Sequence, residues 1–175
     1  MTTDVTARDV TGPGLDMAFG DVSDGLAWVG RRSARRPADF PVCEGMIRSY
    51  CALVEDGNPR YWEDGESPPG MLSVWSFPPP WSPRGRQRRY LFALEVPLRG
   101  RHIVNVSYDC EYHRPIRAGE RLTIQDEVVA VSPEKVTRLG RGHFITTRTS
   151  FFADDELVAT ATNVLYRYDI EEVER

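Results

Sequence analysis

The sequence predicts an α+β fold in which one buried helix precedes a run of antiparallel strands. Apolar residues recur at helical spacing over residues 45–54, and after residue 104 the chain alternates apolar and polar side chains or is rich in β-branched and aromatic residues. One helix followed by four or more strands joined by short turns is an α+β order. The 175 residues are enough for a single domain with one core.

The chain divides into three parts on composition. Residues 1–20 are small, polar and rich in Gly and Pro, and we expect a flexible lead-in there. One domain should span residues 21–170, with an acidic tail at residues 171–175. Its first element is predicted to be a short helix over residues 22–29, capped by Ser23 or Asp24 and ended by Gly30.

The central helix is predicted at about residues 44–55. We expect one face of it to be buried, because five apolar residues share a helical stripe: Met46, Ile47, Tyr50, Cys51 and Val54. Gly57 should stop the helix and Asn58-Pro59 should form a turn. Asp56 would then sit at a helix C-terminus, where the helix dipole opposes ionisation of a carboxyl group. Residues 71–75 predict a second short helix before a run of prolines.

Four strands are predicted after this helical part. In the first, over residues 104–112, apolar side chains alternate with polar ones, which is the period of a one-sided sheet. The other three are predicted by β-branched and aromatic residues at 122–131, 143–152 and 157–168. Residues 153–156, Ala-Asp-Asp-Glu, should join the last two strands as a hairpin.

The loop after the central helix carries the most informative motif, Asp56-Gly57-Asn58-Pro59-Arg60-Tyr61. It resembles the Asp-x-Asn-Pro-x-His signature of the MaoC-like, (R)-specific enoyl-CoA hydratases. The resemblance implies chemistry in which the Asp and the His share a water molecule and add it across the double bond of an enoyl thioester. Here Tyr61 stands at the His position, and a tyrosine with a pKa of about 10 is a poor base at neutral pH.

The resemblance covers roughly residues 26–168 and is closest to the N-terminal, FAS1-like dehydratase type of the family. It is carried in order by Trp28-Val29-Gly30-Arg31, by Pro68-Pro69-Gly70-Met71, by residues 112–120 and by residues 156–159. It implies a hot-dog fold, in which a curved antiparallel sheet wraps a central helix at about residues 44–55.

The same resemblance suggests the site residues. Asp56 and Asn58 would be the catalytic remnant, and Gly70 would offer a backbone N–H to the thioester oxygen. The predicted acyl-binding residues are Tyr61, Trp62, Gly70, Met71 and Trp75. The alternatives are a plain turn for the Asp-Gly-Asn-Pro and Pro-Pro-Gly segments and ordinary core packing for the aromatic residues.

A basic loop follows the prolines. Four of its residues are predicted to bind the phosphates of coenzyme A through forked hydrogen bonds: Arg84, Arg86, Arg88 and Arg89. The alternative is a solvated charge run with no ligand.

Composition limits the other possibilities. The 22 basic and 26 acidic residues give a net charge of -4, which argues against nucleic acid as a partner. Three cysteines without a Cys-x-x-Cys pair fit neither a disulfide framework nor a metal site, so no metal is predicted. No apolar run is long enough to span a membrane, and we expect a cytoplasmic protein.

These observations lead to a functional hypothesis. The chain is predicted to be the non-catalytic or substrate-binding half of a heteromeric enoyl-CoA hydratase or 3-hydroxyacyl-thioester dehydratase that acts on a bulky acyl-CoA in lipid or steroid metabolism. A second MaoC-like subunit would supply the Asp/His dyad, and no cofactor is predicted beyond the coenzyme A of the substrate. The alternatives are a self-sufficient hydratase that uses Asp56 and a non-enzymatic module that binds acyl-CoA.

Overall fold

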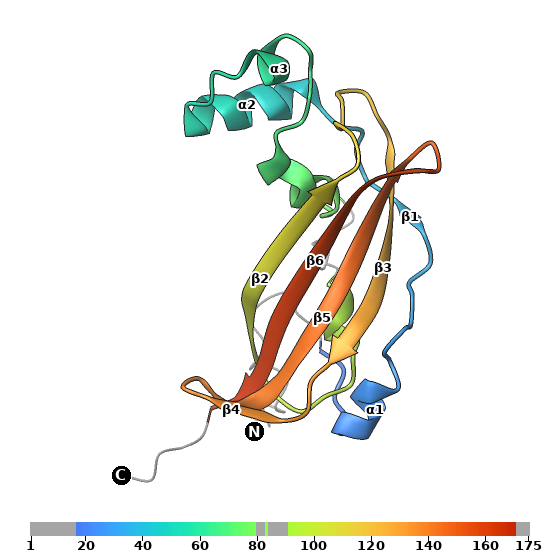
Figure 1. Ribbon diagram of the computed structural model, residues 1–175, viewed down its shortest axis with the longest axis vertical. Coiled ribbons are helices and arrows are strands. Elements are labelled where there is room, and N and C mark those ends of the chain that lie inside the picture. The colour runs from blue at the N-terminus through green and yellow to red at the C-terminus, as the bar shows by residue number, and fades with distance from the viewer. Residues whose placement is uncertain (1–16, 80–82, 84–90, 171–175) are drawn as a thin grey trace, which may run out of the picture.

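A curved, twisted antiparallel sheet forms the body of the molecule, with short helices at its ends and along one side (Figure 1). The computed structural model describes residues 17–79, 83 and 91–170. The described helices are α1 (Val22–Leu26), α2 (Glu44–Val54), α3 (Pro59–Trp62) and the 3-10 helices η1 (Pro69–Trp75) and η2 (Phe92–Leu94). The described strands are β1 (Arg36–Pro37), β2 (His102–Tyr112), β3 (Leu122–Val131), β4 (Lys135–Thr137), β5 (Gly140–Ala153) and β6 (Glu156–Asp169).

The four long strands, β2, β3, β5 and β6, match the predicted ones. The order of strands in the sheet is β1-β3-β5-β6-β2, and β4 pairs with β5. The predicted hairpin between the last two strands is confirmed. Asp154 and Asp155 take positive φ values of 47° and 67°, as the two central residues of a tight hairpin turn do when the twist of the turn matches that of its strands. Helix followed by sheet confirms the α+β class.

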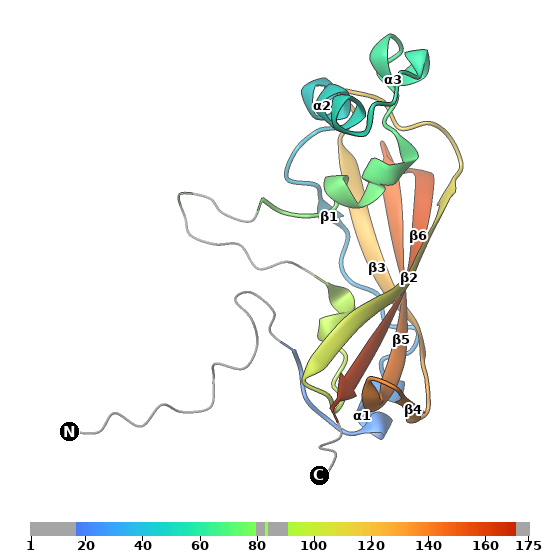
Figure 2. The same cartoon turned by 90° about the vertical axis from the view of Figure 1, so that its left-hand side faces the viewer.

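Helix α2 is confirmed, but it lies across one end of the sheet, with α3 beside it (Figure 2). Ile47 and Cys51 are 0% and 1% exposed and belong to the core. The predicted burial of the whole stripe is wrong, because Met46 and Val54 are 42% and 50% exposed. A helix packed on the end of a sheet reaches the core along a narrow line, so only the middle of the stripe is covered.

Helix α1 starts at the predicted residue, Val22, and ends at Leu26, earlier than predicted. Its N-cap is Asp21, and the carboxylate of Asp24 accepts a hydrogen bond from the Asp21 N–H at 2.9 Å. The predicted caps, Ser23 and Asp24, therefore lie inside the first turn, where Asp24 acts as the acidic partner of a capping box.

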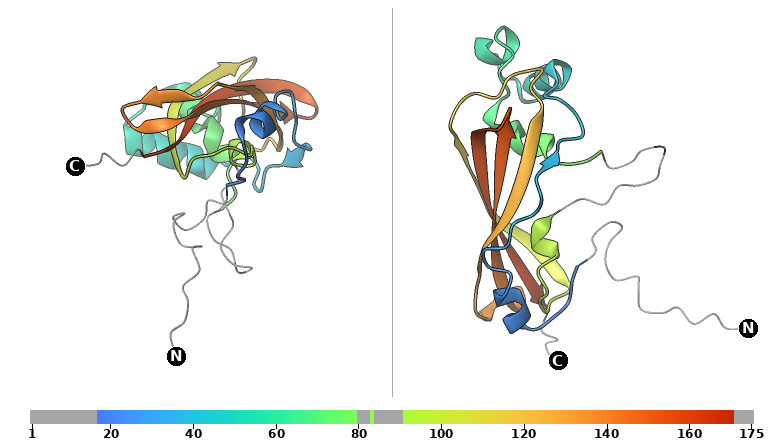
Figure 3. Two further views of the ribbon diagram at one scale, coloured as in Figure 1. Left: turned by 90° about the horizontal axis from the view of Figure 1, so that it is seen from below. Right: turned by 90° about the vertical axis from the view of Figure 1, so that its right-hand side faces the viewer.

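The core lies on the inner face of the sheet, the side on which α2 and η1 lie (Figure 3). It consists of two apolar clusters. The first lies under α2 and η1 and includes Ile47, Met71, Trp75, Ile124 and Phe151. The second lies around η2 and includes Phe92, Val128, Ile145 and Leu165.

Strand β2 is an edge strand of the described sheet, and several of its apolar side chains are exposed. Val104, Val106 and Tyr108 are 37%, 53% and 40% exposed. The alternation of residues 104–112 correctly predicts a strand, but not the buried apolar face that a one-sided sheet would give it. A bulge between Asn105 and Ser107 further breaks the register with β6.

Candidate functional site

The motif loop begins where α2 ends. Glu55 takes the left-handed conformation with φ 55°, and the Asp56 N–H donates to the Cys51 carbonyl at 2.9 Å. Asp56 is half-buried, and its Oδ1 accepts the N–H of Asn58 at 3.0 Å. This local hydrogen bond is an Asx turn. The predicted placement of Asp56 at the C-terminus of the helix is confirmed.

Asn58 has a structural task in this loop. Its side-chain Oδ1 accepts the N–H of Arg60 at 3.1 Å and so caps α3, with Pro59 in the first helical position. The Trp62 indole N–H donates to the Asp56 carbonyl at 2.7 Å and closes the loop from the other side. The four-residue helix α3 was not predicted. The Asn-Pro pair that starts it reads equally well as a turn.

A buried carboxylate fixes the motif loop to the rest of the molecule. Glu66 is 6% exposed and forms ion pairs with Arg60 at 2.7 Å and with Arg117 at 3.4 Å. Arg117 lies in the connection between β2 and β3, and the Ser67 N–H donates to the Ile116 carbonyl beside it at 2.7 Å. The loop that holds Asp56 is therefore anchored to the end of the sheet.

The predicted acyl-binding residues gather at this end, and they differ in depth. Tyr61 and Trp62 are partly buried and pack against the first apolar cluster. Met71 and Trp75 are 2% and 4% exposed and lie within it, with the Trp75 indole N–H bonded to the Ser67 hydroxyl at 2.9 Å.

Gly70 lies in the first turn of η1, between two tyrosines. A Cβ at Gly70 would lie 2.5 Å from the Tyr50 hydroxyl, so glycine leaves room for that group. The Tyr112 hydroxyl donates to the carbonyl of Pro69 and fixes the start of η1 to β2. Burial raises the pKa of Tyr112, with a further contribution from nearby Cys110 and Tyr61.

None of the three histidines of the chain, all of which lie within the described residues, forms a hydrogen bond or an ion pair with Asp56. His102 pairs with Tyr168, and His143 pairs with Arg167, at the end of the sheet where β4 lies and opposite to α2 and α3 (Figure 1). His113 follows β2 and lines a depression on the outer face with Arg148 and Thr160. Tyr61 itself is held by its N–H, which donates to the Asn58 carbonyl at 3.0 Å.

The predicted coenzyme A ligands Arg84, Arg86, Arg88 and Arg89 lie outside the described residues. Over the ranges that are described, no group of three or more His, Cys, Asp or Glu side chains is arranged to hold a metal ion. Within the same ranges, no helix has the length and apolar character needed to cross a membrane.

Sequence reasoning missed a set of polar side chains on the inner face of the sheet. Asp126 is 6% exposed, and Thr147, Thr149 and Asn163 lie near it on β5 and β6. The signal was present in β3, where Leu122, Ile124 and Val128 alternate as buried apolar residues and Asp126 interrupts them at a buried position. Burial raises the pKa of Asp126, although a hydrogen bond from Thr149 and the charge of Arg36 oppose the shift.

Known proteins resemble this chain over most of its length. A family profile described as the FAS1-like, dehydratase domain region matches residues 27–161. The probable enoyl-CoA hydratase alpha subunit of Thermomonospora curvata is 31% identical over 170 residues, which cover 85% of this chain and 52% of that protein. The 3-oxo-4,17-pregnadiene-20-carboxyl-CoA hydratase alpha subunit of Mycobacterium tuberculosis is 28% identical and covers 79% of this chain and 49% of that protein. The chain thus spans about half the length of these curated relatives.

Solved structures show the same fold. A chain of the ChsH1-ChsH2 complex from Mycobacterium tuberculosis superposes with a TM-score of 0.69 at 22% identity, covering 86% of this chain and 97% of that one. A MaoC-like dehydratase superposes with a TM-score of 0.61 at 21% identity, covering 82% of this chain and 43% of that one. The expected hot-dog fold is confirmed. The chain belongs to the FAS1-like dehydratase domain family, the N-terminal type of the MaoC-like hot-dog proteins.

Proposed function

We propose that this chain is the non-catalytic, substrate-binding half of a heteromeric enoyl-CoA hydratase or 3-hydroxyacyl-thioester dehydratase that acts on a bulky acyl-CoA in lipid or steroid metabolism. The observation that carries the proposal is the motif loop, in which Asp56, Asn58 and Pro59 are built as a closed turn while Tyr61 stands where the motif has its histidine. The loop keeps three residues of the motif and lacks its base.

Hydration places a hydroxyl group on the β-carbon of the enoyl thioester and a proton on its α-carbon. One group must take a proton from water and another must deliver one, each within hydrogen-bonding distance. A histidine with a pKa of about 6.5 divides this work with a carboxylate at neutral pH, and a tyrosine does not. A second hot-dog subunit would supply the Asp/His dyad. These proton transfers require no cofactor.

The names of the relatives and the exposed edge of the sheet both support the proposal of a partner subunit. Two relatives carry names that end in alpha subunit, and the ChsH1-ChsH2 structure is a complex. In this chain, β2 lies at an edge of the described sheet with Val104, Val106 and Tyr108 exposed. An edge strand presents unpaired backbone groups, and exposed apolar side chains next to it mark an interaction surface. We place the partner at this edge.

The thioester end of the substrate would lie at the loop end of the sheet. Gly70, Tyr61 and Trp62 gather there with Met71 and Trp75 beneath them. We further propose that the four arginines at 84, 86, 88 and 89 bind the phosphates of coenzyme A.

The proposal is tested by co-expression with the MaoC-like protein encoded nearest to this chain that carries an intact Asp-x-Asn-Pro-x-His motif. Enoyl-CoA hydration is measured for each chain alone and for the purified pair, with crotonyl-CoA and with a bulky enoyl-CoA. Activity on the bulky substrate should require both chains. Hydration by this chain alone, abolished in Asp56→Ala, would show a self-sufficient enzyme instead. Tight acyl-CoA binding without activity in any combination would show a binding module.

A further inference from the structure

The inner face of the sheet carries a polar band between its two apolar clusters. The inner polar band consists of Asp126 on β3, Thr147 and Thr149 on β5, and Asn163 on β6. Strand register places its members side by side, because Asp126 pairs with Thr149 and Thr147 pairs with Asn163. One cluster, with Ile124 and Phe151, lies on one side of the band, and the other, with Val128 and Ile145, lies on the other side.

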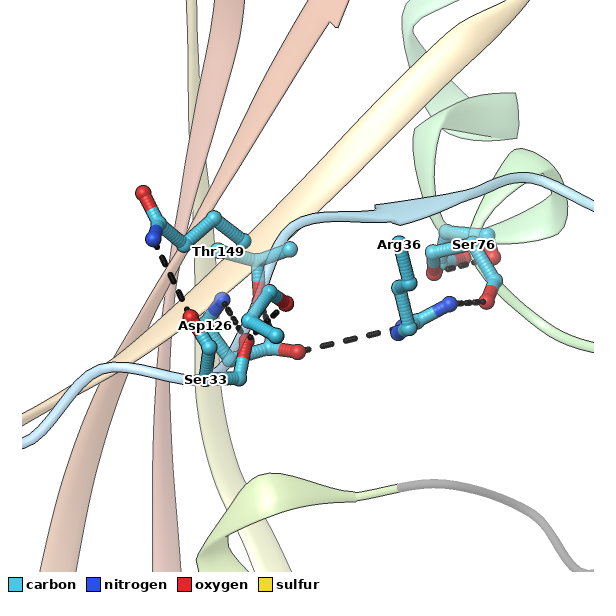
Figure 4. A network of polar contacts seen from close by, with 8 residues as sticks. Ser33, Arg36, Ser76, Asp126 and Thr149 are labelled. Atoms are coloured by element: carbon cyan, nitrogen blue, oxygen red, sulfur yellow. Dashed lines mark hydrogen bonds and ion pairs between the residues drawn. The ribbon is translucent and has the colours of Figure 1, made fainter.

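A buried carboxylate organises this band (Figure 4). The Thr149 hydroxyl donates to Oδ1 of Asp126 at 2.7 Å. Arg36 reaches Oδ2 of Asp126 only at 3.8 Å, and its other terminal nitrogen donates to the Ser76 carbonyl at 3.2 Å. The Asp126 side chain is 8% exposed. One carboxylate oxygen is thus satisfied and the second has a cation nearby at more than hydrogen-bonding distance.

The band lines a cavity of about 50 Å³ between the sheet, η1 and η2. Two acceptors at this cavity, Oδ2 of Asp126 and Oδ1 of Asn163, are buried and have no hydrogen-bond partner within the part of the chain that the structure describes. The rest of the lining combines the apolar side chains of Phe77, Leu91, Phe92, Phe151 and Leu165 with the polar side chains of Arg36, Ser73, Ser76 and Tyr108. A buried polar atom without a partner is costly, so open acceptors in a cavity of this size favour occupation by a group that donates hydrogen bonds.

The chemistry of the cavity selects the donor. An anion is disfavoured because both open atoms are acceptors, one of them on a carboxyl group. An ammonium group is disfavoured because the Arg36 guanidinium lies 3.8 Å from the same carboxylate oxygen. A hydroxyl group at the end of an apolar body can donate its one proton to either acceptor without adding charge, and a cavity of about 50 Å³ has room for that group and the carbon that carries it.

The geometry points to a specificity site in which the inner polar band binds a hydroxyl group carried on the apolar body of the acyl ligand, remote from its thioester. This inference rests on the proposed function for the thioester end of the ligand. It adds that the chain selects acyl groups oxygenated at a distance from the reacting carbons. In the complex, the hydroxyl group would donate to Asp126 Oδ2 or to Asn163 Oδ1.

Affinity measurements with matched probes test the site in the full-length chain. Isothermal titration compares 12-hydroxydodecanoic acid with dodecanoic acid and with 12-methoxydodecanoic acid, which has the oxygen but no proton to donate. We expect the hydroxylated acid to bind about tenfold tighter or more than either of the others, because hydrogen bonds that reach charged partners in a buried site discriminate at this level. Equal affinities, or no binding of any probe, would overturn the assignment.

Variants show whether the band carries the preference. Asp126→Leu with Thr149→Val removes both partners of one hydrogen bond, a change that buried cores tolerate better than the loss of one partner. Asn163→Leu tests the second acceptor by itself. Both changes should bring the ratio of the affinities for the hydroxylated and the unsubstituted acid close to one. Circular dichroism and the thermal midpoint should show that each variant is folded. The matched control is Thr162→Val, next to Asn163 but lining the outer-face depression, which should leave the ratio unchanged.

Coenzyme A thioesters of the same acids separate this inference from the proposed function. Binding of the thioesters without a preference for the hydroxylated chain would remove the specificity site and leave the proposed function standing. A preference among the free acids that depends on Asp126, together with no binding of any thioester, would leave the site standing and remove the proposed function.

Discussion

Asp56 combines a motif position with a structural task, and the two can be separated by substitution. Its carboxylate accepts the Asn58 N–H at 3.0 Å. Asp56→Ala should lower the free energy of unfolding of this chain by about 1 kcal/mol, because that half-buried N–H loses its acceptor. It should change the hydration rate of the assembled heteromer by less than about threefold, because the dyad is expected in the partner subunit.

Urea unfolding of the chain alone and initial rates of the pair measure the two effects. Asp56→Asn is the control, since its amide oxygen can still accept the Asn58 N–H. A loss of hydration by ~10²-fold or more in both variants would make Asp56 a catalytic residue.

Asp126 should make stability depend on pH in the direction opposite to that of a paired carboxylate. Burial raises its pKa in the folded chain above the unfolded value. The folded state therefore holds the proton more tightly, and the free energy of unfolding falls as pH rises from the unfolded pKa of about 3.9 through the folded one. Arg36 from β1 and Tyr108 from β2 line the same cavity.

Asp126→Asn should remove this pH dependence. The substitution should raise stability relative to the native chain at pH 7, and the difference should shrink as pH falls toward 4. Thermal midpoints over this pH range provide the measurement, with exposed Asp109→Asn as the control. A native chain that becomes more stable relative to Asp126→Asn as pH rises would contradict the assignment.

At the scale of elements, the end of α2 stores strain. Glu55 takes φ 55° and ψ 37°, a left-handed conformation that favours glycine. Glu55→Gly should raise the free energy of unfolding by about 0.5 to 1 kcal/mol, less the entropy that glycine adds to the unfolded chain. Chemical denaturation measures the change.

The matched control is Glu63→Gly at the end of α3, where the native φ of -107° is ordinary for a side-chain-bearing residue. This change should destabilise the protein. Equal effects of the two substitutions would mean that Glu55 carries no such strain.

The elements also show which parts of the structure the sequence could predict. Helix α2 and strand β2 follow from periodicity, and β3, β5 and β6 follow from their β-branched and aromatic residues, because both signals extend over many residues. Strand β1, two residues long, and α3, four residues long, are too short to show a periodic pattern. Strand β1 also depends on a distant partner, since Arg36 pairs with Ile124, whereas α3 is a local turn capped by Asn58. The edge position of β2 is set by the order of strands and is invisible to alternation alone.

The residues of the motif loop could be predicted from the sequence, but the burial of the other site residues could not. Asp56, Asn58 and Tyr61 follow from the motif, and the structure brings them into one turn. Burial of Met71 and Trp75 depends on how η1 packs under α2. Asp126 shows in the sequence only as a break in alternation, and its neighbours Thr149 and Asn163 come from other strands.

For the whole molecule, assembly should depend on the β2 edge. Val106 is 53% exposed there in the isolated chain. Val106→Lys should leave the chain folded and reduce recovery of the partner subunit in co-purification by about tenfold or more, because a lysine on an edge strand opposes pairing. Light scattering on the purified mixture checks the mass of the complex.

The control is Leu139→Lys, 48% exposed in the turn between β4 and β5 at the far end of the sheet. Its assembly should match that of the native chain. If Leu139→Lys reduces co-purification and Val106→Lys does not, the interface lies at the β4 end.

The polar band has a further consequence for how this protein can evolve. None of the residues of the band belongs to either apolar cluster. The ligand preference that we propose for the band can therefore change by substitution while the turn at Asp56 and the packing beneath it stay constant. The inner polar band thus divides the inner face of the sheet: the cluster under α2 and η1 supports the motif loop, and the residues of the band can change independently of it.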